Sequence, residues 1–269
     1  MNRKILYGMC LCLFMMIPGC EKEYSWDIKS DNVRRLVVDG MLTNENEPHY
    51  IHLSVTNPEL NQEIQPATGA NVTVTSDDET YAFTESAGEP GVYYSAPFQA
   101  VVGREYNLSI LYEDSLFEAA ARAVSVTPLA DPVITGNEED ELLRYVHGES
   151  GQPAMLEVDY NWAAVPDFCS GYGNCYARET FFTLDNVDVN KIYGPEKQII
   201  WFPEGTVLVR KKYSLSEGYQ AFLRSMLIET EWRGGVFDVQ HGNAPTNMSN
   251  GALGYFAVCM VVSDTIYVD

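Results

Sequence analysis

The stretch Ile51-His52-Leu53-Ser54-Val55 decides the fold class, because apolar and polar residues alternate strictly along it. Alternation with a period of two is typical of a β-strand with one buried face. Similar runs recur about ten residues apart, with turn residues such as Gly88-Glu89-Pro90-Gly91 between them, which predicts an antiparallel β-sandwich. The further runs lie at residues 70–74, 81–83, 106–110 and 119–123.

The distribution of these alternating runs predicts two domains. The sandwich is expected over residues 33–128, and residues 129–151 are expected to form a linker because they contain Asp131-Pro132 and the acidic run Glu138-Glu139-Asp140-Glu141. Alternation then resumes, and it predicts a second β-rich domain over residues 152–269. Its strands are expected at residues 156–162, 176–184, 198–202, 206–213, 253–262 and 265–268.

One segment of the second domain has a different period. Tyr219, Phe222, Leu223, Met226 and Leu227 follow helical spacing and form one apolar stripe. An amphipathic α-helix is therefore expected at about residues 215–230, and Ser214 with Glu217 matches a capping box before it. The predicted fold is mostly β: a sandwich followed by a second β-rich domain that carries one helix.

The N-terminus predicts export. Arg3 and Lys4 precede an uncharged run over residues 5–17, which is too short to span a bilayer and is typical of a secretory signal over residues 1–19. Ile17-Pro18-Gly19-Cys20 resembles a bacterial lipobox, so Cys20 is the expected lipid attachment site. Residues 20–32 are polar and are expected to form a tether. Cys20 as an attachment site predicts a lipid-anchored protein. Glu21-Lys22-Glu23, directly after it, resemble the surface-export signal of Bacteroidota lipoproteins, and that resemblance implies the outer membrane, on the cell surface rather than on the periplasmic face.

The charge balance limits the partners. The chain has 17 basic and 38 acidic residues; loss of Arg3 and Lys4 with the signal leaves 15 basic residues and a net charge of −23. Such a surface repels nucleic acid, so no nucleic-acid partner is expected. It favours solubility, and calcium binding is an alternative that the composition leaves open.

The cysteines predict one disulfide. Cys169 and Cys175 enclose a short loop with two glycines, which in an oxidising compartment predicts a disulfide, with free thiols as the alternative. Cys259 lies in an apolar run and is expected to be buried and inert.

The sequence contains no catalytic signature that we can assign. His49 and His52 are three residues apart on a predicted strand, so they should point to opposite faces and are not expected to share a metal ion. We predict no enzyme activity, no cofactor and no metal site. A pair of carboxylates that meet only in space remains an alternative, because the chain is rich in acids.

Aromatic residues surround the predicted disulfide. Tyrosine and tryptophan on loops are common contacts for ligands and protein partners, whereas the alternative is that these rings fill the core of the second domain. The candidate contact residues are Trp162, Phe168, Tyr172 and Tyr176.

Several motifs resemble known families. Val37-Val38-Asp39-Gly40 and Pro90-Gly91-Val92-Tyr93 resemble transthyretin-like or carboxypeptidase-regulatory-like β-sandwiches. Gly234-Gly235-Val236-Phe237 and Leu253-Gly254-Tyr255-Phe256 follow in the second domain. Together with the lipobox, this order resembles the DUF4249 family of Bacteroidota lipoproteins.

That resemblance implies no catalytic residue. Members of the family are often encoded beside TonB-dependent transporters, so the resemblance implies an accessory binding or partner subunit in nutrient uptake. The alternative is a structural or adhesive surface protein with no role in transport. The expected partners are the membrane, through the lipid, and a TonB-dependent outer-membrane transporter.

Overall fold

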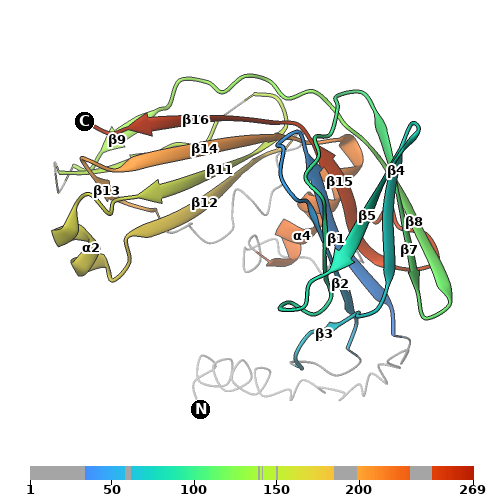
Figure 1. Cartoon of the computed structure of the whole chain (residues 1–269). Helices are drawn as coiled ribbons and strands as arrows, with labels where there is room; N and C mark the ends of the chain where they lie inside the picture. Colours follow the sequence, from blue (N-terminus) through green and yellow to red (C-terminus); the bar gives the residue numbers. More distant parts are fainter. Residues whose placement is uncertain are drawn as a thin grey trace, which may run out of the picture. The chain divides into compact units, whose positions relative to one another are not determined.

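The computed structural model describes residues 34–57, 62–138, 140, 142–149, 151–184, 199–230 and 244–269 (Figure 1). The predicted signal, the lipid attachment site Cys20 and the tether lie outside these residues. The described residues, all from Arg34 onward, form one compact unit that is mostly β, as the sequence predicts. The described residues contain two main cores, each enclosed by its own sheet or sheets.

The first core lies inside a sheet of nine strands. In the path of the sheet β15 pairs with β1, and the order continues through β2, β6, β5, β4 and β7 to β8, while β3 pairs with β2. Residues 119–123 are rich in alanine, which favours a helix, but they lie mostly in a strand, as the alternation predicts. The strands are β1 (Leu36–Thr43), β2 (Tyr50–Val55), β3 (Gln65–Pro66), β4 (Asn71–Ser76), β5 (Glu79–Glu85), β6 (Val92–Ser95), β7 (Glu105–Tyr112), β8 (Ser115–Arg122) and β15 (Leu253–Cys259).

This sheet folds around its core. Strand pairing runs without a break from β15 to β8, and a bridge between Val124 and Cys259 joins the segment after β8 to β15. The two halves of the predicted sandwich are therefore parts of one hydrogen-bonded sheet. Its core contains side chains from both halves, such as Val38, Ile51, Val72 and Ile110.

The C-terminal strand β15 corrects the predicted domain boundary. We expected residues 253–262 in the second domain, but β15 pairs with β1 in a parallel register, with Phe256 opposite Gly40. The reason is that both faces of β15 are buried: Phe256 and Val258 pack into the first core, and Ala257 and Cys259 pack into a separate cluster behind it. Burial on both faces is typical of strands with a parallel neighbour.

The second core lies between two smaller sheets. The antiparallel four-stranded sheet has the order β12 (Tyr176–Thr183), β11 (Ala154–Asn161), β14 (Val207–Ser214) and β16 (Val261–Tyr267). The three-stranded sheet has the order β13 (Phe202–Pro203), β10 (Leu143–Val146) and β9 (Ile134–Gly136). Residues from both sheets meet in this core, among them Val146, Val158, Tyr160, Phe202 and Leu208.

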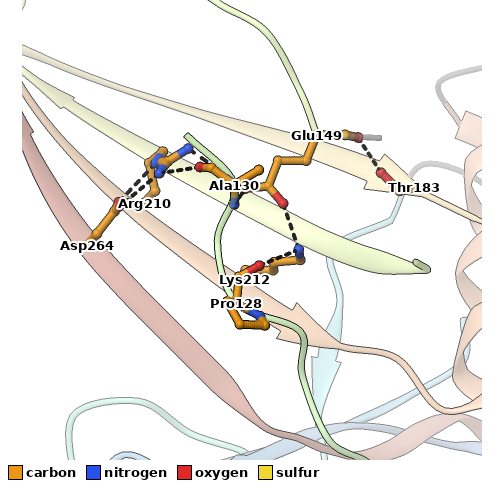
Figure 2. A network of polar contacts seen from close by, with 7 residues as sticks. All are labelled: Pro128, Ala130, Glu149, Thr183, Arg210, Lys212 and Asp264. Carbon is orange, nitrogen blue, oxygen red and sulfur yellow. Dashed lines mark hydrogen bonds and ion pairs between the residues drawn. The ribbon is translucent and has the colours of Figure 1, made fainter. Parts of the chain in front are cut away.

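The segment 129–151 is more ordered than a linker. It forms β9 and β10, and its ends are bound to the core-facing side of β14 (Figure 2). Arg210 donates hydrogen bonds to Asp264 and to the carbonyl of Ala130, and Lys212 donates to Glu149 at 2.6 Å and to the carbonyl of Pro128 at 3.1 Å. Buried cations need such partners, so the carbonyl of Ala130 and the carboxylate of Glu149 give this segment a structural role that composition does not indicate.

The structure describes two helices. Helix α4 (Glu217–Thr230) confirms the predicted amphipathic helix, and its rings Tyr219 and Phe222 lie 5.2 and 5.3 Å from the ring of Tyr255 on β15. The predicted cap is displaced by two residues, because the hydroxyl of Ser216, not Ser214, accepts the hydrogen bond from the backbone of Tyr219.

Helix α2 (Pro166–Tyr172) is not predicted by the sequence pattern. Pro166 occupies its first turn, where the missing N–H costs nothing, and Gly173 ends it with a left-handed φ of 79°. Neither described helix has the length and apolar character needed to cross a bilayer.

Candidate functional site

The four-stranded sheet has one face on the second core and one face that points away from it. Along β11 the residues Leu156, Val158 and Tyr160 are buried, whereas Glu157 and Asp159 alternate with them and are partly exposed. Residues directly opposite each other on antiparallel strands share a face. The strand register therefore assigns the following residues to the outward face: Met155, Glu157, Asp159, Asn161, Tyr176, Arg178, Thr180, Phe182, Val207, Val209, Lys211, Tyr213, Val261, Ser263, Thr265 and Tyr267.

A shallow groove lies on this face near the end of β11. It has a volume of about 590 Å³. Its polar lining comes from β11, from β12 and from the turn before β12. The lining residues are Asp159, Tyr160, Asn161, Asn174, Tyr176, Ala177, Arg178 and Val209.

An ion pair forms one side of the groove. Arg178 donates hydrogen bonds to both carboxylate oxygens of Asp159, from Nε at 2.5 Å and from Nη2 at 2.9 Å. Its Nη1 lies 3.3 Å from the carboxylate of Glu157. The hydrogen bonds to Asp159 raise the pKa of Arg178, whereas burial raises the pKa of Glu157 more than the neighbouring guanidinium lowers it. The bidentate geometry fixes the orientation of both side chains.

The disulfide packs against the second core, and its loop reaches the groove through Asn174. Cys169 and Cys175 are bonded, as predicted, with their Cα atoms 4.7 Å apart. The loop that they close contains Asn174. Its backbone carbonyl accepts a hydrogen bond of 2.7 Å from the indole N–H of Trp162. Its side-chain oxygen accepts a hydrogen bond of 3.3 Å from the backbone N–H of Tyr176. The loop therefore connects the core to the rim of the groove.

The four aromatic residues singled out from the sequence do not form one patch. Trp162 is completely buried, so it belongs to the core and is not available to a ligand. Phe168 and Tyr172 pack against its ring at 5.3 and 5.1 Å, on the side of the core. Tyr172 is half exposed there. Tyr176 alone lines the groove on the outward face, with 56% of its surface exposed.

Strand pairing brings together residues that the sequence pattern does not connect. Tyr176 lies opposite Asn161, Asn161 opposite Val207, and Val207 opposite Tyr267. Tyr267 is 72% exposed. The alternation at residues 156–162 does indicate that Glu157, Asp159 and Asn161 share a face, but it does not reveal their neighbours on other strands.

The remaining candidate groups are buried or separate. His49 is buried against Phe98, to whose carbonyl its Nε2 is 2.9 Å, and burial lowers its pKa. His52 lies opposite Asp39 on the outer side of β2. Burial raises the pKa of the Cys259 thiol to about 12, which fits the predicted inert cysteine. Among the residues that the structure describes, no group of three or more His, Cys, Asp or Glu side chains is placed to hold a metal ion.

Met155, Tyr213 and Val261, at one end of this face, pack against residues of β15 and helix α4. The fold and the other end of the face define a mostly β protein with an open, polar sheet surface bordered by Tyr176 and Tyr267. Residues 21–265 match the family DUF4249, a domain of unknown function, and the chain belongs to that family. This match confirms the family that the motifs indicated. No curated protein matches the chain.

Proposed function

We propose that this protein is a lipid-anchored binding subunit of a TonB-dependent uptake system in the outer membrane. It binds its ligand without transforming it, and the groove on the outward face of the four-stranded sheet is the binding surface. The lipobox at Cys20 supports the anchoring, and the family resemblance supports the transport partner.

The observation that supports the proposal is the open groove, one side of which is a hydrogen-bonded ion pair. Asp159 and Arg178 are held by each other, and the exposed ring of Tyr176 lies beside them. Rigid side chains on regular strands lose little conformational entropy when a ligand binds, so such a surface suits reversible capture.

The predicted tether fits a protein that works close to a membrane. Residues 20–32 amount to 13 residues, which reach up to about 45 Å when fully extended. The folded part of the chain, attached through a tether of this length, remains close enough to the membrane to contact an integral membrane partner.

The test is recovery of the partner from cells. We expect the wild-type protein, cross-linked in intact cells and purified from solubilised membranes, to bring down a large β-barrel protein. Cys20→Ser should release the protein from the membrane and abolish that recovery. Repeated recovery of no barrel from wild-type cells contradicts the proposal.

The groove is tested by growth. The double variant Tyr176→Ala and Arg178→Ala should still recover the barrel but should slow growth on the nutrients on which the deletion strain grows slowly. The matched control, Leu111→Ala with Arg122→Ala, removes an exposed apolar residue and an exposed arginine from the first sheet and should grow normally. Unchanged growth of the deletion strain on every nutrient, together with loss of cell attachment, instead supports the adhesive alternative.

A further inference from the structure

We propose that the outward face of the four-stranded sheet binds a neutral oligosaccharide that lies across the strands, with Tyr176 and Tyr267 as stacking platforms. This inference rests on the proposed binding role of that face and names its ligand class.

The first argument is the spacing of the two tyrosines. Tyr176 and Tyr267 occupy the two edge strands of the sheet, and Asn161 and Val207 lie between them in one cross-strand row. Three steps between neighbouring strands separate the two backbones by about 14 Å. Both rings are more than half exposed on the same face. A ligand that contacts both must be extended and must run across the strands.

The second argument is the chemistry of the ring surfaces. An aromatic ring presents a flat apolar face with a negative quadrupole, which attracts C–H groups. The C–H face of a sugar ring is a ligand surface of that kind, and its edge is lined by hydroxyl groups. Two exposed tyrosines at the ends of one row therefore suit two sugar rings of one chain.

The third argument is the mixture of donors and acceptors beside the rings. The next row of the same face contains Arg178, Asp159 and Thr265, and Asn161 lies in the row of the tyrosines. Sugar hydroxyls both donate and accept, so they pair with guanidinium, carboxylate, amide and hydroxyl groups alike. The bidentate bond between Arg178 and Asp159 holds these groups in place before a ligand arrives.

Charge selects a neutral ligand. On this face Arg178 contacts both Asp159 and Glu157, and Lys211 donates to Glu45 at 2.8 Å, so the charges are paired. The whole chain has a net charge of −21, which repels acidic polymers. A protein partner fits less well, because Val207 and Val209 are the aliphatic residues in these two rows and both are only partly exposed.

The experiment is native affinity electrophoresis of the full chain in gels that contain one soluble polysaccharide each. The neutral probes are galactomannan, xyloglucan, mixed-linkage β-glucan and dextran, and the anionic probe is alginate. We expect at least one neutral polysaccharide to retard the wild-type protein and alginate to have no effect. Tyr176→Ala and Tyr267→Ala should each weaken the interaction about tenfold, whereas Leu111→Ala should not change it.

Phenylalanine variants separate stacking from hydrogen bonding. Tyr176→Phe and Tyr267→Phe keep the ring face and should retain binding within about twofold, with the fold checked by circular dichroism. Short oligosaccharides of the polysaccharide that binds should gain affinity with length, and only the longer ones should be sensitive to both tyrosines.

Several outcomes overturn the inference. One is that no neutral polysaccharide retards the protein, or that alginate alone does. Another is that the Ala and Phe variants lose equal affinity for the polysaccharide. A third is that a protein partner is cross-linked at Tyr176. If the β-barrel is recovered but no glycan binds, the proposed function stands and this inference fails. If a glycan binds but no barrel is recovered, the inference stands and the uptake role fails.

Discussion

Gly254 on β15 lies opposite Val38 on β1, and the two backbones are so close that no side chain fits at residue 254. A Cβ atom built on Gly254 would be 2.8 Å from the carbonyl carbon of Val38 and closer still to its oxygen. Gly254 also has a φ of +86°, which L-residues rarely adopt. The C-terminal part of the chain therefore joins the first sheet through a contact that only glycine permits.

Gly254→Ala should destabilise the protein strongly. The variant adds the strain of a left-handed backbone to a collision with backbone atoms that cannot rotate away, and we expect a loss of about 3 kcal/mol in the free energy of unfolding. Gly251→Ala is the matched control, because Gly251 has a similar φ of +73° but open space around it. It should lose only about 1 kcal/mol. Urea unfolding measures both, and equal losses would contradict the close contact.

Lys212 tests the buried polar network of Figure 2. Its side chain is 7% exposed and that of its partner Glu149 is 11% exposed. Lys212→Met leaves the Glu149 carboxylate without its nearest cation, so we expect a loss of about 3 kcal/mol in the free energy of unfolding. Arg210 remains 3.8 Å from this carboxylate, a longer contact than the one that is lost. Adding Glu149→Gln removes the weakly paired charge and should recover part of the loss.

An exposed ion pair provides the control for this network. Arg104 lies 3.2 Å from Asp77 and 3.4 Å from Glu79, and all three side chains are well exposed. Arg104→Met should cost less than about 1 kcal/mol, because water screens such pairs. Equal losses for Lys212→Met and Arg104→Met in urea unfolding would mean that the network contributes nothing beyond an ordinary surface pair.

Glu157 and Glu85 should respond to pH with opposite signs. Burial raises the pKa of Glu157 above its ordinary value of 4.5, so the folded state favours the protonated form and this stability is lost as pH rises. The stability of Glu157→Gln relative to the wild type should therefore improve between pH 4 and pH 7.

The Glu85 carboxylate has the reverse arrangement. It accepts hydrogen bonds from the backbone N–H groups of Gly69 and Gly91, at 2.8 and 3.0 Å, and these bonds lower its pKa. The stability that they supply is present above pH 4.5 and is lost as pH falls. Glu85→Gln should therefore be destabilising at pH 7 and less so at pH 4. Thermal unfolding across this pH range measures both variants, and parallel curves would contradict the assignment.

The local patterns of the sequence predicted most of the strands. Alternation at residues 51–55 and 106–110 matches β2 and β7, and the alanine-rich segment before Arg122 is a strand because its register on β7 buries Ala119. The helical stripe predicted α4. In these cases the period of burial is a property of the segment itself, so the sequence is enough to identify it.

The remaining features depend on pairing between distant segments. β15 pairs with β1 across more than 200 residues, and a buried apolar run gives no indication of its neighbour. β9 and β10 have three and four residues, too few to show a period. The groove is a further example, because Tyr176, Asp159 and Val209 meet only through the register of three strands.

The disulfide should stabilise the groove as well as the fold. Replacing both Cys169 and Cys175 by alanine frees a loop whose ends are six residues apart, and we expect a loss of about 2 kcal/mol. Asn174 lies inside this loop and contacts both Trp162 and Tyr176, so ligand binding at the groove should weaken too. Urea unfolding followed by tryptophan fluorescence measures the stability. Dithiothreitol should shift the wild-type protein to the stability of the double variant and leave the variant unchanged, because Cys259, the other cysteine in the part of the chain that the structure describes, is buried and free. A double variant as stable as the oxidised wild type would show that α2 holds the loop without the covalent bond.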